Sequence, residues 1–96
     1  MTLERKEELY RLIFDLEEVL LGFKSLRNKK YEGLVIDFNE YVKDHNSLVN
    51  ISDGLYEIDL IKDEVEDWEL QELIKLAIED IENEISYVQE VLENYN

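Results

Sequence analysis

The sequence predicts a mainly α protein, a small bundle of three to four helices in which two long amphipathic helices dominate. Apolar residues recur at helical spacing near each end of the chain. Apolar residues make up 45% of the 96 residues, and there is no cysteine, so the core must hold without disulfides. Because a chain of this length can enclose only one core, we expect residues 1–96 to form a single acidic helical domain.

The first expected helix runs from about residue 3 to 27. One apolar stripe recurs at steps of three and four residues, with charged residues between its members. Its members are Leu9, Leu12, Ile13, Leu16, Val19, Leu20, Phe23 and Leu26. Tyr10, Phe14 and Leu21 lie off this stripe, so either the helix is buried on two sides or one face is left for a partner.

A second helix is expected over about residues 30–44, after a basic turn at residues 26–30. Its apolar face consists of Tyr31, Leu34, Val35, Phe38, Tyr41 and Val42. The helix propensity is mixed, because residues 33–36 are also suited to the start of a strand. The polar segment at residues 44–47 then ends the helical pattern.

Residues 48–60 allow two interpretations. Apolar and polar residues alternate on both sides of Asp53-Gly54, which is typical of a β-hairpin and would make the protein α+β. Against this, Ile58, Ile61, Val65 and Trp68 follow one side of a helix. A loop leading into a helix is the favoured interpretation, with a short hairpin as the alternative.

The last expected helix spans about residues 68–95, with Asp67 as its N-cap. Its apolar seam is close to a heptad repeat and is long enough to pack along the first helix. The seam consists of Leu70, Ile74, Ala77, Ile81, Ile85, Val88, Leu92 and Tyr95, widened by Leu73, Ile78 and Val91.

Negative charge is concentrated in the second part of the chain. Residues 57–96 hold fourteen carboxylates and two lysines, a net of −12 out of −15 for the whole chain. Residues 57–72, the acidic segment, carry eight of these acids: Glu57, Asp59, Asp63, Glu64, Glu66, Asp67, Glu69 and Glu72. Such a charge repels nucleic acids and anionic membranes and favours encounter with basic proteins. We therefore expect a protein partner, and neither nucleic acid nor membrane.

The residue types give little support for catalysis or for a cofactor. His45 is the only histidine, and its polar surroundings predict a solvated loop residue rather than a general base. No Glu-x-x-His pair suggests a di-iron site, and the isolated glycines form no phosphate-binding loop. We expect a non-enzymatic protein without a metal or other cofactor.

The acidic segment instead predicts a protein-binding surface. If it were helical, Asp59, Asp63 and Glu66, and then Glu69, Glu72 and Glu79, would form rows with carboxylates about 5 to 10 Å apart. That spacing overlaps the spacing of phosphates along a DNA strand, so the row could occupy a groove built for nucleic acid. Tyr56 and Trp68 are candidate aromatic anchors, although a role in the core fits either of them equally well.

These features favour an inhibitor that binds and blocks a basic, nucleic-acid-handling protein. The most concrete version is a phage-encoded anti-defence protein, an anti-CRISPR-like DNA mimic acting in the host cytoplasm, because the N-terminus carries no secretory signal. One alternative is a bacterial immunity protein or antitoxin that neutralises a basic toxin. Another is a structural module that self-associates through its C-terminal helix, and a homodimer is compatible with each of these functions.

Overall fold

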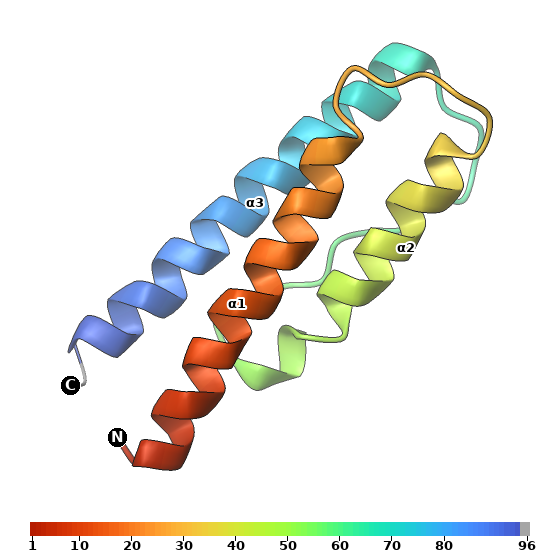
Figure 1. Ribbon diagram of the computed structural model, residues 1–96. Coiled ribbons are helices and arrows are strands. Elements are labelled where there is room, and N and C mark those ends of the chain that lie inside the picture. Colours follow the sequence, from red (N-terminus) through yellow and green to blue (C-terminus); the bar gives the residue numbers. More distant parts are fainter. Residues whose placement is uncertain (95–96) are drawn as a thin grey trace.

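The computed structural model describes residues 1–94 and is mainly helical. It contains α1 (Leu3–Ser25), α2 (Leu34–Asn46), a single 3-10 turn η1 (Val49–Ile51) and α3 (Asp67–Asn94). The bundle is elongated, measuring 46 × 19 × 16 Å, with the start of α1 and the end of α3 at one tip (Figure 1). The helical bundle predicted from the sequence is confirmed. The alternative β-hairpin at residues 48–60 is wrong, because no strand forms within residues 1–94.

The core lies between α1 and α3, which run antiparallel along most of the molecule (Figure 1), and α2 closes its remaining side. The seams predicted for the first and last helices supply most of the buried side chains. The fully enclosed members include Leu12, Leu16, Phe23, Ile74 and Ile81. Phe23 also meets Phe38 of α2 edge-on, with ring centroids 5.3 Å apart. Most of the described seam residues of α3 are buried inside the bundle, whereas Leu73 is exposed and Val91 is partly buried.

The first helix is shorter than predicted at its C-terminal end. At the N-terminus, the Thr2 hydroxyl accepts a hydrogen bond from the Arg5 N–H, a standard N-cap. The helix ends at Ser25 rather than at residue 27, and Asn28 adopts a left-handed conformation with φ 61°. Gln71 of α3 stabilises this turn, since its side-chain amide accepts from the Asn28 N–H and donates to the Lys29 carbonyl.

The second helix is displaced relative to the prediction by four residues at its start and two at its end. Gly33 precedes it with φ 91°, a left-handed conformation that disfavours a helix continuing backwards through this residue. The Tyr31 hydroxyl donates a hydrogen bond to the Asp37 carboxylate in the first turn of the helix, with 2.5 Å between the two oxygens. At the other end the helix includes His45 and Asn46, so the predicted loop at residues 44–47 is wrong for these two residues.

The third helix begins one residue earlier than predicted and continues through Asn94, and its predicted end at residue 95 lies outside the described residues. Asp67, the predicted N-cap, is instead the first helical residue. The backbone N–H of the preceding Glu66 donates to the Glu69 carboxylate at 3.4 Å, in the manner of half a capping box. Trp68 does not share an apolar face with the core and is 71% exposed. The predicted seam residue Tyr95 lies outside the described residues.

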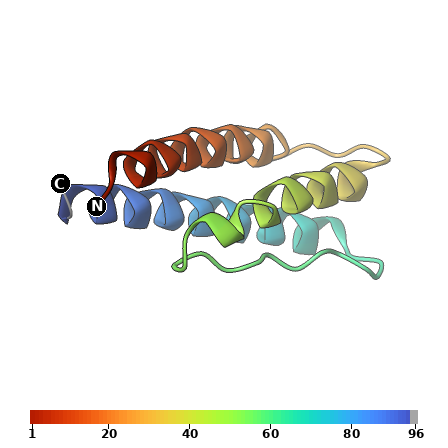
Figure 2. The same cartoon turned by 90° about the horizontal axis from the view of Figure 1, so that it is seen from below.

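A connecting segment, residues 52–66, joins η1 to α3 without any helix or strand of its own. It passes along the side of α2 and α3 that faces away from α1 (Figure 2). Leu55 is buried, and Ile58, Ile61 and Val65 pack against the core from outside. The helix suggested by the spacing of residues 58, 61, 65 and 68 does not form before Asp67, so the predicted helical row of Asp59, Asp63 and Glu66 is wrong.

Candidate protein-binding surface

The predicted acidic residues lie at the surface. Seven of the eight are exposed and Glu69 is partly buried. Both predicted aromatic anchors are also exposed, Tyr56 by 79% and Trp68 by 71%, so neither belongs to the core. The acidic and aromatic residues therefore lie on the connecting segment and the start of α3. Up to residue 66 they are carried by irregular chain, and from Asp67 onward by a helix.

Two asparagines of α2 hold the connecting segment in place. The Asn46 amide donates to the Ile58 carbonyl and accepts from the Ile58 N–H, both at 2.9 Å. Asn39 makes the same pair of bonds to Ile61, at 2.9 and 2.8 Å. Each asparagine thus takes the place of a neighbouring β-strand for one residue, and we call these two contacts the asparagine clamps.

The clamps are compatible with an extended path of the segment between them. Asn39 and Asn46 are seven residues apart, which is about 10.5 Å along a helix. Ile58 and Ile61 are only three residues apart, and three residues of fully stretched chain span at most about 10 to 11 Å. The two lengths are similar, and the hydrogen bonds fix the backbone that carries Asp59 on both sides of this residue.

His45 contacts one of the clamps, the Asn46 side chain, from the interior of the bundle. It is fully buried, and its Nε2 lies 2.6 Å from the Glu84 carboxylate of α3. Its Nδ1 lies 2.9 Å from Asn46 Oδ1, and that oxygen is identified by the hydrogen bond it accepts from Ile58. Both ring nitrogens therefore face acceptors, and an imidazole can donate from both nitrogens only when it is protonated.

The electrostatics of the site agree with this protonated state. Burial by itself lowers the pKa of His45, but the hydrogen bonds to Glu84 and Asn46, with the negative charges of Glu84 and Asp80, outweigh it, so the pKa is raised above 6.5. The predicted solvated loop histidine is thus wrong. His45 instead forms a buried ion pair, and the chain of contacts from Glu84 through His45 and Asn46 ends on the backbone of Ile58.

Most of the acidic residues have no cationic partner within the molecule. Within residues 1–94, Lys30 and Asp67 form a surface ion pair at 3.0 Å, whereas Glu57, Asp59, Asp63 and Glu64 take part in none. Lys62 is the single base inside the acidic segment. The charge of the connecting segment is therefore left for an external cation or a basic partner to neutralise.

Among the shallow hollows that border the connecting segment, two lie along residues 54–63. One of about 440 Å³ follows its backbone from Glu57 to Asp63 above Asn46. The other, of about 310 Å³, lies between Tyr56 and Tyr87, with Asp80 and Glu84 in its wall. Gly54 lies close to the Tyr87 ring there, since a Cβ on this residue would come within 2.1 Å of the ring unless Tyr87 moved.

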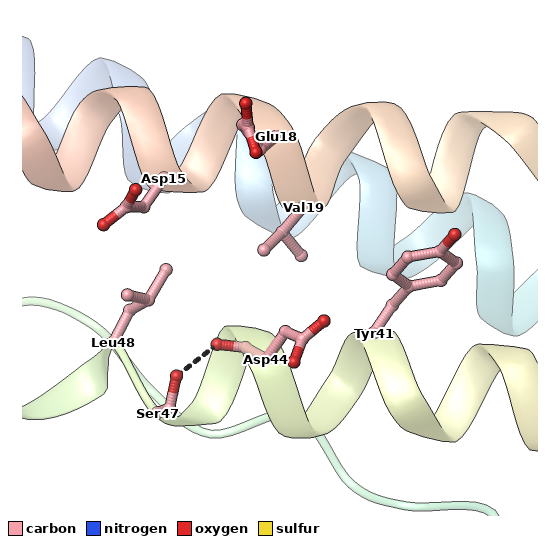
Figure 3. Close-up of a pocket in the computed structure, with 7 residues that line it drawn as sticks. All are labelled: Asp15, Glu18, Val19, Tyr41, Asp44, Ser47 and Leu48. Atoms are coloured by element: carbon pink, nitrogen blue, oxygen red, sulfur yellow. Dashed lines mark hydrogen bonds between the residues drawn. The ribbon is translucent and has the colours of Figure 1, made fainter.

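A third hollow, between α1 and α2, does not form a metal site (Figure 3). It measures about 340 Å³ and includes Asp15, Glu18 and Asp44 in its lining, but the three carboxylates point in different directions (Figure 3). Throughout the described residues, no group of three or more acidic, histidine or cysteine side chains is arranged to hold a metal ion.

Sequence reasoning identified the acids and aromatics but missed the residues that fix their backbone. Asn39, Asn46 and His45 look like ordinary polar helix residues, and no local pattern indicates that their partners lie 12 to 39 positions away. Only the packing of the connecting segment across α2 reveals their role.

Comparisons with models of known protein families, with curated proteins and with solved structures found no match for this chain. None of the helices in the described part of the chain is long and apolar enough to cross a membrane.

Proposed function

We propose that this protein is a non-enzymatic binding protein whose acidic segment occupies a basic surface of another protein and blocks it. The observation that supports this most strongly is the construction of the connecting segment. Its carboxylates are exposed and without cationic partners, while the backbone beneath them is held by two asparagine clamps and a buried ion pair. The fixed backbone holds these carboxylates in one arrangement, which suits recognition of a partner of fixed shape.

The rigidity matters for affinity. A flexible acidic tail loses conformational entropy when it is ordered on a partner, about 1 to 2 kcal/mol for each backbone residue. A segment that is already ordered avoids most of that loss. The clamped backbone of residues 58–61 therefore supports a surface that recognises a partner of fixed shape, rather than a tail that only provides solubility.

The spacing of the carboxylates favours a partner that handles nucleic acid. Glu57 and Asp59 are two residues apart, which is about 6.6 Å in an extended chain. A DNA strand likewise carries closely and regularly spaced negative charges, one for each rise of about 3.4 Å along its axis. The partner would be a nuclease or another nucleic-acid-binding protein, and its cationic groove would be closed to its own substrate.

Two biological settings share this chemistry. One is a phage-encoded anti-defence inhibitor, of which an anti-CRISPR-like DNA mimic is the concrete form, and the other is an immunity protein or antitoxin against a basic toxin. Both use electrostatic steering to reach the partner quickly. The identity of the captured protein distinguishes them, since a defence nuclease indicates the first setting and a toxin the second.

The test is affinity capture with three forms of the full chain at low salt. The first is the native protein. The second carries Glu57→Ser, Asp59→Ser, Asp63→Ser and Glu64→Ser, four exposed acids without hydrogen bonds or ion pairs among the described residues. The third carries Glu4→Ser, Glu7→Ser, Glu90→Ser and Glu93→Ser, which removes the same charge from exposed positions outside the acidic segment.

We expect the native protein and the third form to retain the same nucleic-acid-binding protein, and the second form to lose it. Equal retention by all three forms would show that another surface of the protein is responsible. Equal loss from both variants would likewise contradict a role for the connecting segment in particular.

A further inference from the structure

The outer face of α1 carries a row of exposed apolar side chains that no part of residues 1–94 covers. Leu3, Tyr10, Phe14 and Leu21 are 71%, 57%, 60% and 67% exposed, and we call them the outer stripe. They are separated by seven, four and seven residues, eighteen in total, which is five full turns of a helix with 3.6 residues per turn. All four therefore lie along one line on the helix, about 27 Å long.

The outer stripe lies on the opposite side of α1 from the core. The buried residues Leu12, Leu16 and Phe23 are centred about half a turn away from it around the helix axis. In Figure 2, α1 forms one edge of the molecule, and both other helices and the connecting segment lie to the same side of it. All four members of the stripe are thus exposed to solvent, and a row of large exposed apolar side chains is a candidate interaction site.

The spacing of the outer stripe identifies its partner. The series of seven, four and seven residues reads the same in both directions, so it is symmetric about the level of residue 12. If two copies of α1 pack antiparallel about a two-fold axis at that level, Tyr10 of one copy lies against Phe14 of the other, and Leu3 lies against Leu21. Every apolar member then meets an apolar member, and each contact occurs twice, as a two-fold interface requires.

One edge of the stripe adds charge complementarity. Lys6 and Glu17 flank the stripe on the same side of the helix. In the two-fold arrangement, each edge of the stripe lies against the same edge of the second chain. Lys6 of one chain then lies beside Glu17 of the other, twice. The other edge carries Glu7, Arg11 and Glu18 and is less favourable, so the apolar stripe has to supply most of the attraction.

We propose that the outer stripe of α1 is a homodimer interface in which a second copy of this chain packs antiparallel across a two-fold axis. Four large side chains, each contributing on the order of 100 Å² of exposed surface, would bury about 800 Å² over the two copies. That area is below the roughly 1,200 to 2,000 Å² of a specific stable interface, so the dimer is weak and depends on concentration. Because each chain carries a net charge of −15, added salt strengthens the dimer by screening repulsion.

The dimer would present two acidic segments at once. The connecting segment lies on the side of the bundle away from α1 (Figure 2), so pairing through α1 leaves both copies of it facing outward. A target with two basic sites would then be bound by both, with a gain in avidity. The dimer itself does not depend on the proposed function, and the two respond to salt in opposite directions.

The first experiment is sedimentation velocity of the full chain from about 1 to 200 μM, the range expected for a weak interface. We expect a shift from monomer to dimer that moves to lower concentration when salt is raised. Tyr10→Ser with Phe14→Ser should remain monomeric throughout, while Ile36→Ser, which removes a similarly exposed apolar side chain from α2 (66% exposed), should dimerise like the native protein. Circular dichroism confirms that each variant keeps its helices.

The second experiment tests the antiparallel register. An equimolar mixture of Leu3→Cys and Leu21→Cys chains should form a disulfide-linked dimer under mild oxidation, because these positions face each other across the two-fold axis. Leu3→Cys alone should not, since its two copies would be about 27 Å apart along the helix.

Native protein that stays monomeric at every concentration would overturn the proposal. The stripe would also be excluded as the interface if the double serine variant dimerised as well as the native chain. Efficient crosslinking of Leu3→Cys with itself would contradict the antiparallel arrangement and indicate a parallel pair.

Discussion

At the scale of single residues, the most informative feature is the substitution of side-chain amides for backbone partners. Asn39, Asn46 and Gln71 each bond both a backbone N–H and a backbone carbonyl of irregular chain. The groups bonded by Asn39 and Asn46 are partly buried and would otherwise lack partners, at a loss of about 1 to 3 kcal/mol each, whereas the groups bonded by Gln71 are exposed. Irregular segments can therefore lie against the bundle without forming strands.

His45 gives a direct test of this network. Because Nδ1 and Nε2 both face acceptors, we expect an NMR titration of its ring protons to give a pKa above 6.5. Glu84→Gln removes the main negative charge beside the ring and should lower that pKa. A titration midpoint at or below 6.5 in the native protein would mean that His45 is neutral and that the ion pair does not form.

The same pKa shift predicts how stability changes with pH. A histidine whose pKa is higher in the folded than in the unfolded protein stabilises the fold fully below about pH 6.5, the unfolded value. This contribution is lost as the pH rises through the folded pKa. We expect the free energy of unfolding in urea to fall above pH 6.5 in the native protein, and to fall less in His45→Gln, which keeps every other charge. Parallel pH profiles for the two proteins would contradict this.

At the scale of elements, the helices could be predicted from the sequence and the segments between them could not. The stripes of α1 and α3 are set by apolar periodicity, and the same residues form the core. The start of α2 depends on the left-handed backbone at Gly33, for which the sequence offers only a glycine. The path of the connecting segment depends on contacts with Asn39 and Asn46, which are distant in sequence. The acids and exposed aromatics could be identified in advance, but their extended arrangement could not.

The start of α2 can be tested at Gly33. An alanine in the left-handed region loses roughly 1 to 2 kcal/mol relative to a favoured conformation, and no neighbouring atom lies within 4 Å of the position its Cβ would take. We expect Gly33→Ala to reduce the free energy of unfolding by about that amount through backbone strain alone. Glu32→Ala, at the adjacent exposed position, should have little effect. Equal stability of the two variants would mean that the left-handed conformation is not needed.

The asparagine clamps can be tested by amide hydrogen exchange. Asn39→Ala removes both hydrogen bonds to Ile61. We therefore expect the backbone amide of Ile61 to exchange at least tenfold faster, equivalent to about 1.4 kcal/mol of local stability. The amides of α1 and α3 should keep their native protection. Gln89→Ala, on an exposed face of α3, is the matched control. Unchanged protection of Ile61 would show that the clamp does not hold the segment.

At the scale of the whole molecule, the connecting segment and the outer stripe occupy opposite sides of the bundle. The connecting segment carries exposed carboxylates on one side, and the outer stripe of α1 lies on the other (Figure 2). The two surfaces respond differently to salt, because screening weakens attraction to a basic partner and reduces repulsion between two acidic copies. The elongated bundle thus separates the surface proposed to bind a target from the surface proposed to bind a second copy.

The net charge also predicts the salt dependence of target binding. Affinity for a basic partner should decrease steadily as salt is raised from about 50 to 300 mM, because the attraction is between exposed charges. The measurement is a binding titration against the captured protein at several salt concentrations. The Glu57→Ser, Asp59→Ser, Asp63→Ser, Glu64→Ser variant should bind more weakly and show a flatter dependence. Affinity that does not change with salt would argue against electrostatic recognition.

The measurement that tests the central claim most directly is competition with DNA for the captured protein. Fluorescence anisotropy would follow a labelled duplex bound to that protein as the unlabelled chain is added. The native chain and the Glu4→Ser, Glu7→Ser, Glu90→Ser, Glu93→Ser variant should displace the duplex at similar concentrations. The variant that lacks Glu57, Asp59, Asp63 and Glu64 should need at least about tenfold more, a difference of about 1.4 kcal/mol in binding. Failure of the native chain to displace DNA, or equal displacement by both variants, would contradict the account.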